Sequence, residues 1–326
     1  MRLRRLLLAG TGAAVGAYLV QRRRRNLAIQ AAPLHDHTRR ILEPVTVELE
    51  GGEAVSVIDA GDGPAIVMVP GLSGDHQVYR YQVGSLTRSY RVIATDLRSG
   101  FDGVERNFDR FAHDIATVMD ARGVRSAVVM ALSFGGPIGI RFATLYPDRL
   151  RALILTATLA RLDLSHVGLN RTLFIPVARW TSRYLPEVLM RSLARIWGRW
   201  GIWVYDDTPG NERVIEYELD APAAVPAAVG GLRMDTFRRL DLRPELSRIS
   251  QPTLLIAGTA DSYTPPEWQR QIAASLPNAT YVEIPGAGHL ALISRAETFN
   301  QVVLEWLEEK IVRGEAVADA PSAETA

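Results

Sequence analysis

The sequence predicts an α/β protein: a mainly parallel eight-stranded sheet with helices on both faces, an inserted helical cap and an apolar N-terminal helix. Three observations predict it. Short apolar runs alternate with segments of helical periodicity, which is typical of a parallel sheet covered by helices. The roughly 90 residues between Ala160 and Ser250 contain no convincing strand. An uncharged run near the N-terminus, from Leu6 to Val20, has arginines on both sides.

Composition narrows the class of protein. With 326 residues, 47% hydrophobic content and a net charge of +1, the chain suits one folded domain with an insertion. Zero cysteines exclude disulfides, thiolate metal sites and a cysteine nucleophile. Lys310 is the one lysine, which excludes a Walker-type phosphate loop because that loop needs a lysine after its glycines. We expect no nucleic-acid partner.

Residues 1–25 are predicted to be a membrane anchor. As a helix, the uncharged run from Leu6 to Val20 would span roughly 22 Å, short of the ~30 Å hydrocarbon core, but snorkelling arginines and local thinning can close the gap. A cleaved signal peptide, and so a secreted protein, is an alternative, as is a helix docked elsewhere; the arginines at 22–25 argue against cleavage. The arginines before and after the apolar run are nearly equal in number, so the charge distribution favours a cytoplasmic location of the folded domain only weakly.

The rest of the chain divides by its pattern. Residues 26–43 are predicted to be a polar linker and residues 313–326 a disordered tail. The sheet and its helices are expected in two parts, 44–159 and 249–312, and the segment 160–248 between them is the predicted cap.

Each predicted strand is an apolar run that a turn residue ends. Gly51 and Gly52 join the first two strands as a hairpin, Pro70 ends the third and Asp96 the fourth. Helices are expected where apolar residues recur at helical spacing. The predicted strands are 45–49, 54–58, 65–69, 91–95, 127–132, 150–157, 253–258 and 280–284, and helices are expected at 76–88, 107–122 and 296–312.

A sharp strand-to-helix turn is predicted at Ser133. An apolar run precedes it and a helix-period segment follows, which is the context of a nucleophile elbow: the turn lifts a hydroxyl above the end of a buried strand. The first N–H groups of the helix then point at whatever sits on that hydroxyl. The sequence departs from the Gly-x-Ser-x-Gly pattern at Ala131, whose methyl group crowds the turn.

Two further polar residues follow predicted strands. Asp261 lies after the strand 253–258 and His289 after the strand 280–284, so both belong to the edge where sites form in parallel sheets. A serine nucleophile needs a base to take its proton and a third group to orient the base. The order Ser133, Asp261, His289 suits this fold class. We therefore predict these three as catalytic residues, with no metal and no cofactor.

The motifs resemble those of the α/β-hydrolase fold superfamily, in its cap-bearing, esterase-like branch. The resemblance covers about residues 45–310 and implies that the backbone N–H groups of Leu72 and Phe134 form an oxyanion hole. Many relatives carry a histidine where Pro70 stands. The matching segments are Pro70-Gly71-Leu72, Asp96-Leu97-Arg98, the Ser133 elbow, Gly258 to Asp261, and Gly288-His289.

The sequence thus predicts a serine hydrolase that cleaves a carboxylic ester through an acyl-enzyme. The leucines, valines and tryptophans of the cap favour an apolar small-molecule substrate, including a lipid ester near the bilayer. An acyltransferase, a C–C hydrolase or an aminopeptidase could use the same three residues. A membrane-tethered binding protein that lost activity is the alternative from another class.

Overall fold

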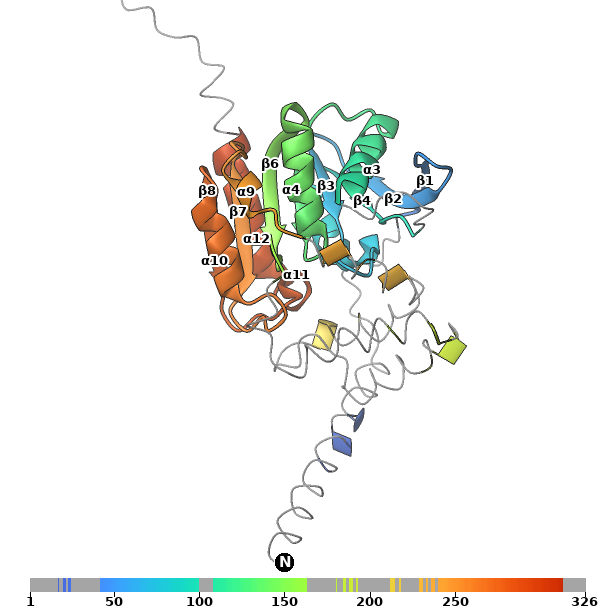
Figure 1. The fold of residues 1–326 in the computed structure, drawn as a ribbon, viewed down its shortest axis with the longest axis vertical. Helices are drawn as coiled ribbons and strands as arrows, with labels where there is room; N and C mark the ends of the chain where they lie inside the picture. Colours follow the sequence, from blue (N-terminus) through green and yellow to red (C-terminus); the bar gives the residue numbers. More distant parts are fainter. Residues whose placement is uncertain are drawn as a thin grey trace, which may run out of the picture.

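The computed structural model describes residues 42–99, 108–162 and 240–312, with isolated residues between 17 and 24 and between 180 and 237. Its centre is an eight-stranded sheet in the order β1-β2-β4-β3-β5-β6-β7-β8 (Figure 1). The first two pairings are antiparallel and the others parallel, which confirms the predicted sheet. The strands are β1 (Val45–Glu48), β2 (Ala54–Ala60), β3 (Ala65–Val69), β4 (Arg91–Thr95), β5 (Ala127–Leu132), β6 (Leu150–Thr156), β7 (Thr253–Gly258) and β8 (Ala279–Ile284).

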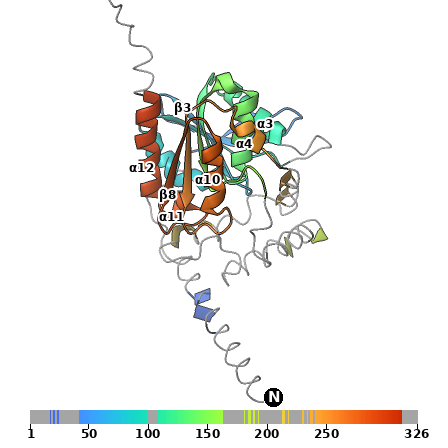
Figure 2. The same cartoon turned by 60° about the vertical axis from the view of Figure 1, so that its left-hand side comes forward.

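Helices cover both faces of the sheet. Figure 2 shows α12 on one side and α3, α4 and α10 on the other. The buried side chains form two clusters, one under each layer of helices. The first layer comprises α3 (Phe108–Ala121), α4 (Gly135–Leu145), α9 (Arg243–Leu246) and α10 (Pro266–Ser275), and the second α2 (Arg80–Leu86), α11 (Ala291–Ser294) and α12 (Ala296–Leu307).

The central strand β5 shows how the sequence produces this layering. All six of its residues are buried, because helices cover the sheet on both sides. Successive side chains point to opposite faces, so Val129 and Ala131 join the cluster under α3 and α4, whereas Met130 and Leu132 join the cluster under α12. The strand ends in the middle of the sheet, directly before Ser133.

Two predicted helices differ from the observed ones at their ends. The helix expected at 76–88 begins as a 3₁₀ turn, His76–Tyr79, because the Asp75 side chain accepts the Gln77 N–H and caps a tighter first turn. It continues as α2. The helix expected at 296–312 is α-helical to Leu307 and then widens into a π turn, Glu308–Val312.

Much of the predicted anchor and cap lies outside the described residues, as do the tail 313–326 and most of the linker 26–43. Among the residues that are described, no helix combines the length and the apolar character that crossing a membrane demands. The apolar helix expected within residues 1–25 stays a prediction, because most of that segment lies outside the described residues. At the boundaries of the predicted cap, the Leu242 N–H donates to the Ala160 carbonyl at 2.8 Å, which holds the two ends of the insertion together.

Candidate active site

Ser133 occupies a sharp turn between the end of β5 and the start of α4. Its φ of 52° lies in the left-handed region, which costs a non-glycine residue about 1–3 kcal/mol. Its N–H donates to the Thr156 carbonyl at 2.9 Å, and its carbonyl accepts from the Gly136 N–H at 2.9 Å and the Thr158 hydroxyl at 2.7 Å. The surroundings thus hold the strained backbone that a nucleophile elbow requires.

Two glycines let α4 begin close to the sheet. A Cβ at Gly136 would overlap the Thr158 hydroxyl, and one at Gly139 would lie 3.1 Å from the Ala131 Cβ. Ala131 stands where the elbow pattern has glycine, and it is fully buried. The missing side chain of Gly139 leaves room for the Ala131 methyl group, so this departure from the pattern is accommodated in the first turns of the helix.

The structure brings the three predicted catalytic side chains together. His289 Nε2 lies 3.0 Å from Ser133 Oγ, and His289 Nδ1 lies 3.0 Å from Asp261 Oδ2. Because Nδ1 faces a carboxylate that only accepts, we assign the ring proton to Nδ1, which leaves Nε2 to accept from the serine hydroxyl. In this tautomer the imidazole can take up the serine proton.

Four donors surround the Asp261 carboxylate. Oδ1 accepts from the N–H groups of Tyr263 at 2.8 Å and Thr264 at 3.0 Å. Oδ2 accepts from the Thr264 hydroxyl at 2.6 Å and from His289 Nδ1. Burial alone would raise the pKa of Asp261, but the electrostatic attraction to His289 and the hydrogen bonds from His289 and Thr264 outweigh burial and lower the pKa. The carboxylate therefore stays charged beside the imidazole.

Backbone hydrogen bonds join the loops that carry Asp261 and His289. The Ala260 N–H donates to the Ala287 carbonyl at 2.8 Å. A Cβ at Gly258 would overlap that same carbonyl oxygen, so the loops approach this closely only because position 258 has no side chain. The distance between the Asp261 carboxylate and the His289 imidazole is thus set by the loops that follow two neighbouring strands.

The two predicted oxyanion donors lie next to the serine. Phe134 follows Ser133 directly, and Leu72 lies on the loop after β3, where a Cβ at Gly71 would be 3.5 Å from the Ser133 Cβ. Within the described part of the chain, neither the Leu72 N–H nor the Phe134 N–H donates to a protein group. This placement is compatible with an oxyanion hole made by these two groups.

Three polar residues near these side chains were not predicted from the sequence. Thr264 bonds to Asp261, Thr158 bonds to Ser133, and the buried Arg233 bonds to the Leu72 carbonyl. The spacing of an aspartate and a threonine three residues later is typical of a side-chain-capped turn, so a local signal for Thr264 exists. Thr158 and Arg233 have no such signal, because their partners lie far away in the chain.

A second polar cluster links the loops after β3 and β4. Ligand atoms of Asp75, His76 and Asp96 lie within 4.8 Å of one another and could in principle hold a cation. Both imidazole nitrogens are already engaged: Nδ1 lies 2.6 Å from Asp96 Oδ1, and Nε2 lies 3.1 Å from Gln77 Nε2. Burial would lower the pKa of His76, but the hydrogen bond to Asp96 and the charges of Asp96 and Asp75 raise it. We therefore interpret the cluster as a structural link.

Fold and site together define a class of protein. A serine at a strand-to-helix turn, with an aspartate and a histidine from later strands at the same edge of a mainly parallel sheet, is the arrangement of the α/β hydrolases. The model of the alpha/beta hydrolase fold family matches residues 64–296, and the chain belongs to this family.

Similar proteins include hydrolytic enzymes. RutD of Azorhizobium caulinodans, a candidate carbamate hydrolase, is 30% identical over 257 residues, which cover 76% of this chain and 93% of that protein. An esterase of Thermogutta terrifontis is 26% identical with a TM-score of 0.68, covering 82% of this chain and 98% of the esterase. The polyketide synthase ThaQ of Burkholderia thailandensis is 29% identical over 292 residues, 83% of this chain, but this chain spans only 13% of its length.

Proposed function

We propose that this protein is a serine hydrolase that cleaves a carboxylic ester through an acyl-enzyme. The observation that carries the proposal is the unbroken series of hydrogen bonds from Ser133 Oγ through His289 to Asp261, with 3.0 Å at each step. The similarity to an esterase and to a candidate carbamate hydrolase supports hydrolysis at a carbonyl group.

In the first half of the reaction, Ser133 Oγ attacks the ester carbonyl carbon while its proton passes to His289 Nε2. The carbonyl oxygen becomes negative and accepts hydrogen bonds from the N–H groups of Leu72 and Phe134, each worth about 3 kcal/mol in such a site. Asp261 stabilises the imidazolium without taking its proton. The C–O bond to the alcohol then breaks, and the alcohol leaves with the proton from Nε2.

In the second half, a water molecule replaces the alcohol. His289 Nε2 takes one proton from this water while the water oxygen attacks the acyl carbon. The N–H groups of Leu72 and Phe134 hold the second oxyanion. The bond to Ser133 Oγ breaks, the serine recovers its proton from Nε2, and the carboxylic acid leaves. The protein's own residues handle every proton in this cycle.

Replacement of Ser133 tests the proposal. Ser133→Ala should lower the turnover of p-nitrophenyl butyrate by about four orders of magnitude or more, and a fluorophosphonate probe should label the wild type at Ser133. Ser275→Ala, on the exposed side of α10, is the matched control and should behave as wild type. The proposal fails if folded Ser133→Ala retains full turnover, or if the probe leaves Ser133 unlabelled.

The 30% sequence identity to RutD favours a second candidate substrate, a carbamate in place of the ester. The same residues would act, but the carbamate nitrogen donates electrons to the carbonyl and makes its carbon harder to attack. The comparison of p-nitrophenyl butyrate with p-nitrophenyl N-butylcarbamate distinguishes the two, because the leaving group is identical. Esters of increasing acyl length test the predicted preference for an apolar substrate.

A further inference from the structure

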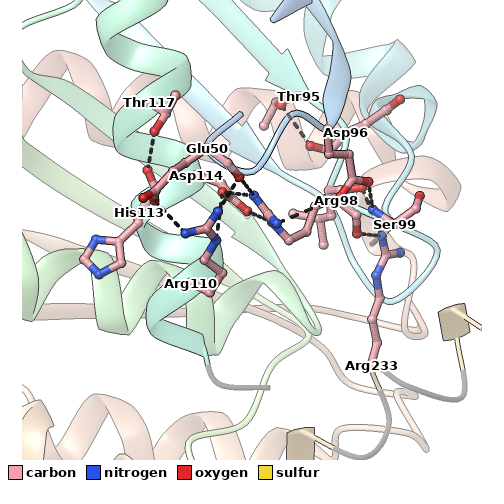
Figure 3. A network of polar contacts seen from close by, with 12 residues as sticks. Glu50, Thr95, Asp96, Arg98, Ser99, Arg110, His113, Asp114, Thr117 and Arg233 are labelled. Atoms are coloured by element: carbon pink, nitrogen blue, oxygen red, sulfur yellow. Dashed lines mark hydrogen bonds and ion pairs between the residues drawn. The ribbon is translucent and has the colours of Figure 1, made fainter. Parts of the chain in front are cut away.

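Arg233 is a buried cation whose hydrogen-bond partners are backbone carbonyl groups. It belongs to the segment between β6 and β7, and its side chain is fully buried. Its Nη1 donates to the Leu72 carbonyl at 2.8 Å, and its Nη2 donates to the carbonyls of Leu97 at 3.0 Å and Arg98 at 2.7 Å. One guanidinium therefore joins the loop after β3 to the loop after β4. Figure 3 shows it reaching the chain at Arg98 and Ser99.

The charge of Arg233 has no direct counter-ion in the described part of the chain. Glu53 and Asp96 act on it only through space, and burial lowers the pKa of Arg233 to about 10. Among the described residues, its buried Nε has no hydrogen-bond partner. Arg98, by contrast, pairs with Asp114 at 2.5 and 2.8 Å. Neutral carbonyl groups compensate a buried cation less than a carboxylate does, so the burial of Arg233 costs free energy.

The guanidinium fills the inner side of the turn that carries Leu72. Gly74 has a φ of 67°, and a Cβ there would overlap Arg233 Nη1. The Gly74 N–H closes the turn onto the Gly71 carbonyl at 2.9 Å, and the Gly74 carbonyl accepts from the Leu97 N–H at 2.9 Å. The guanidinium, the turn and the neighbouring loop thus form one bonded unit beside the serine.

We propose that Arg233 is a positioning residue for the oxyanion hole. It bonds the Leu72 carbonyl and packs against Gly74, whose N–H holds the Gly71 carbonyl of the peptide group that carries the Leu72 N–H. Arg233 thereby fixes the turn that directs this N–H, and it places a positive charge against the same turn. Both effects stabilise the transition state more than bound substrate, because the donors are oriented before the reaction begins. The inference rests on the proposed function and adds that one side chain from the segment between β6 and β7 orients the hole.

Two variants of Arg233 test the inference. Arg233→Met removes every donor and the charge at similar length, and Arg233→Lys keeps the charge but cannot bond three carbonyls in the same geometry. The main measurement is the rate constant for labelling of Ser133 by a fluorophosphonate, whose phosphoryl oxygen gains negative charge in the same hole. A second is the kcat and KM for p-nitrophenyl butyrate.

We expect Arg233→Met to lower the labelling rate and kcat by about 100-fold, the effect of losing one oriented oxyanion donor, with KM changed less than about threefold. Arg233→Lys should lie between this variant and the wild type. The matched control is Arg91→Met, which removes a partner of Asp59 at the opposite end of β4 and should label at the wild-type rate.

Melting curves establish which variants fold. If Arg233→Met does not fold, Gly74→Ala gives the second test, because the alanine Cβ displaces the guanidinium while Arg233 is retained. We expect this variant to have a lower kcat and an unchanged KM. Wild-type labelling in folded variants overturns the inference, and so does a rise in KM with unchanged kcat. A wild type that is not labelled overturns the proposed function itself, which separates the two failures.

Discussion

Replacement of Thr264 with valine removes one hydrogen bond from the buried carboxylate of Asp261 and changes little else, because the two side chains have nearly the same shape. The hydroxyl donates to Asp261 Oδ2 at 2.6 Å and lies 3.3 Å from His289 Nδ1. The backbone N–H groups that donate to Oδ1 remain in the variant. The variant therefore isolates the contribution of one hydroxyl.

The magnitude follows from the charge and burial of the acceptor. A hydrogen bond to a charged group contributes about 1.5–3 kcal/mol net. Asp261 is 4% exposed, so water cannot readily replace the lost donor. We expect the free energy of unfolding at pH 7 to fall by about 1.5–3 kcal/mol, and the melting temperature by about 2–5 °C. Most of the activity should remain, because His289 keeps its contacts with Ser133 and Asp261.

The loss should also depend on pH. Burial raises the pKa of Asp261, but the charge of His289, its hydrogen bond and those of Thr264 lower it below the usual 3.8. Stability from a lowered carboxyl pKa is fully present above pH 3.8 and is lost as the pH falls through the folded-state pKa. The difference between wild type and Thr264→Val should therefore shrink in acid, and the variant should unfold at a higher pH during acid titration.

Urea denaturation at pH 7 and acid titration, both followed by tryptophan fluorescence, measure these effects. Thr264→Ser keeps the hydroxyl and should lie much closer to the wild type. Thr87→Val, which removes a hydroxyl that donates to the Val83 carbonyl on α2, controls for the loss of an ordinary threonine hydrogen bond. Equal stability of Thr264→Val and wild type, or a difference that persists unchanged in acid, would refute the reasoning.

Two further predictions concern Ser133 and His76. Because φ at Ser133 is 52°, Ser133→Gly should relieve strain and be about 0.5–1 kcal/mol more stable than Ser133→Ala. Both variants should be inactive. A glycine variant that melts at a lower temperature than the alanine variant would contradict this prediction. Burial opposes but does not cancel the effect of Asp96, so the pKa of His76 is raised above 6.5 and its stabilisation is lost as the pH rises through the folded-state value. In urea titrations from pH 6.5 to about pH 8.5, the wild type should lose stability relative to His76→Gln. A stability difference between the two proteins that does not change with pH would disprove this prediction.

The strands could be predicted because each is a buried apolar run with a turn residue at its end. The bounds of β3, β4, β5 and β7 are those expected from the sequence. Once the strands are parallel and their order is known, the chain itself brings Ser133, Asp261 and His289 to one edge. Spacing along the sequence therefore predicted a meeting of side chains up to 156 residues apart.

The remaining features of the site depend on contacts that no local pattern encodes. Arg233 bonds carbonyls that lie 135 to 161 residues away, and any arginine of that segment would look the same in the sequence. The effect of Ala131 on the elbow likewise could not be judged, because the space for its methyl group comes from Gly139. These features depend on which atoms surround a residue after folding.

The bonded loops after β7 and β8 have a consequence for how such a protein can change. Asp261 and His289 both lie downstream of the segment between β6 and β7, and their spacing depends on Gly258 and the loop around Ala287. We therefore expect that spacing to stay intact when the chain between Leu162 and Leu240 is lengthened, shortened or exchanged. If the proposed function holds, exchanging this segment should change the substrate range while the acid and base keep their spacing, provided that the graft restores a cation against the turn at Gly74.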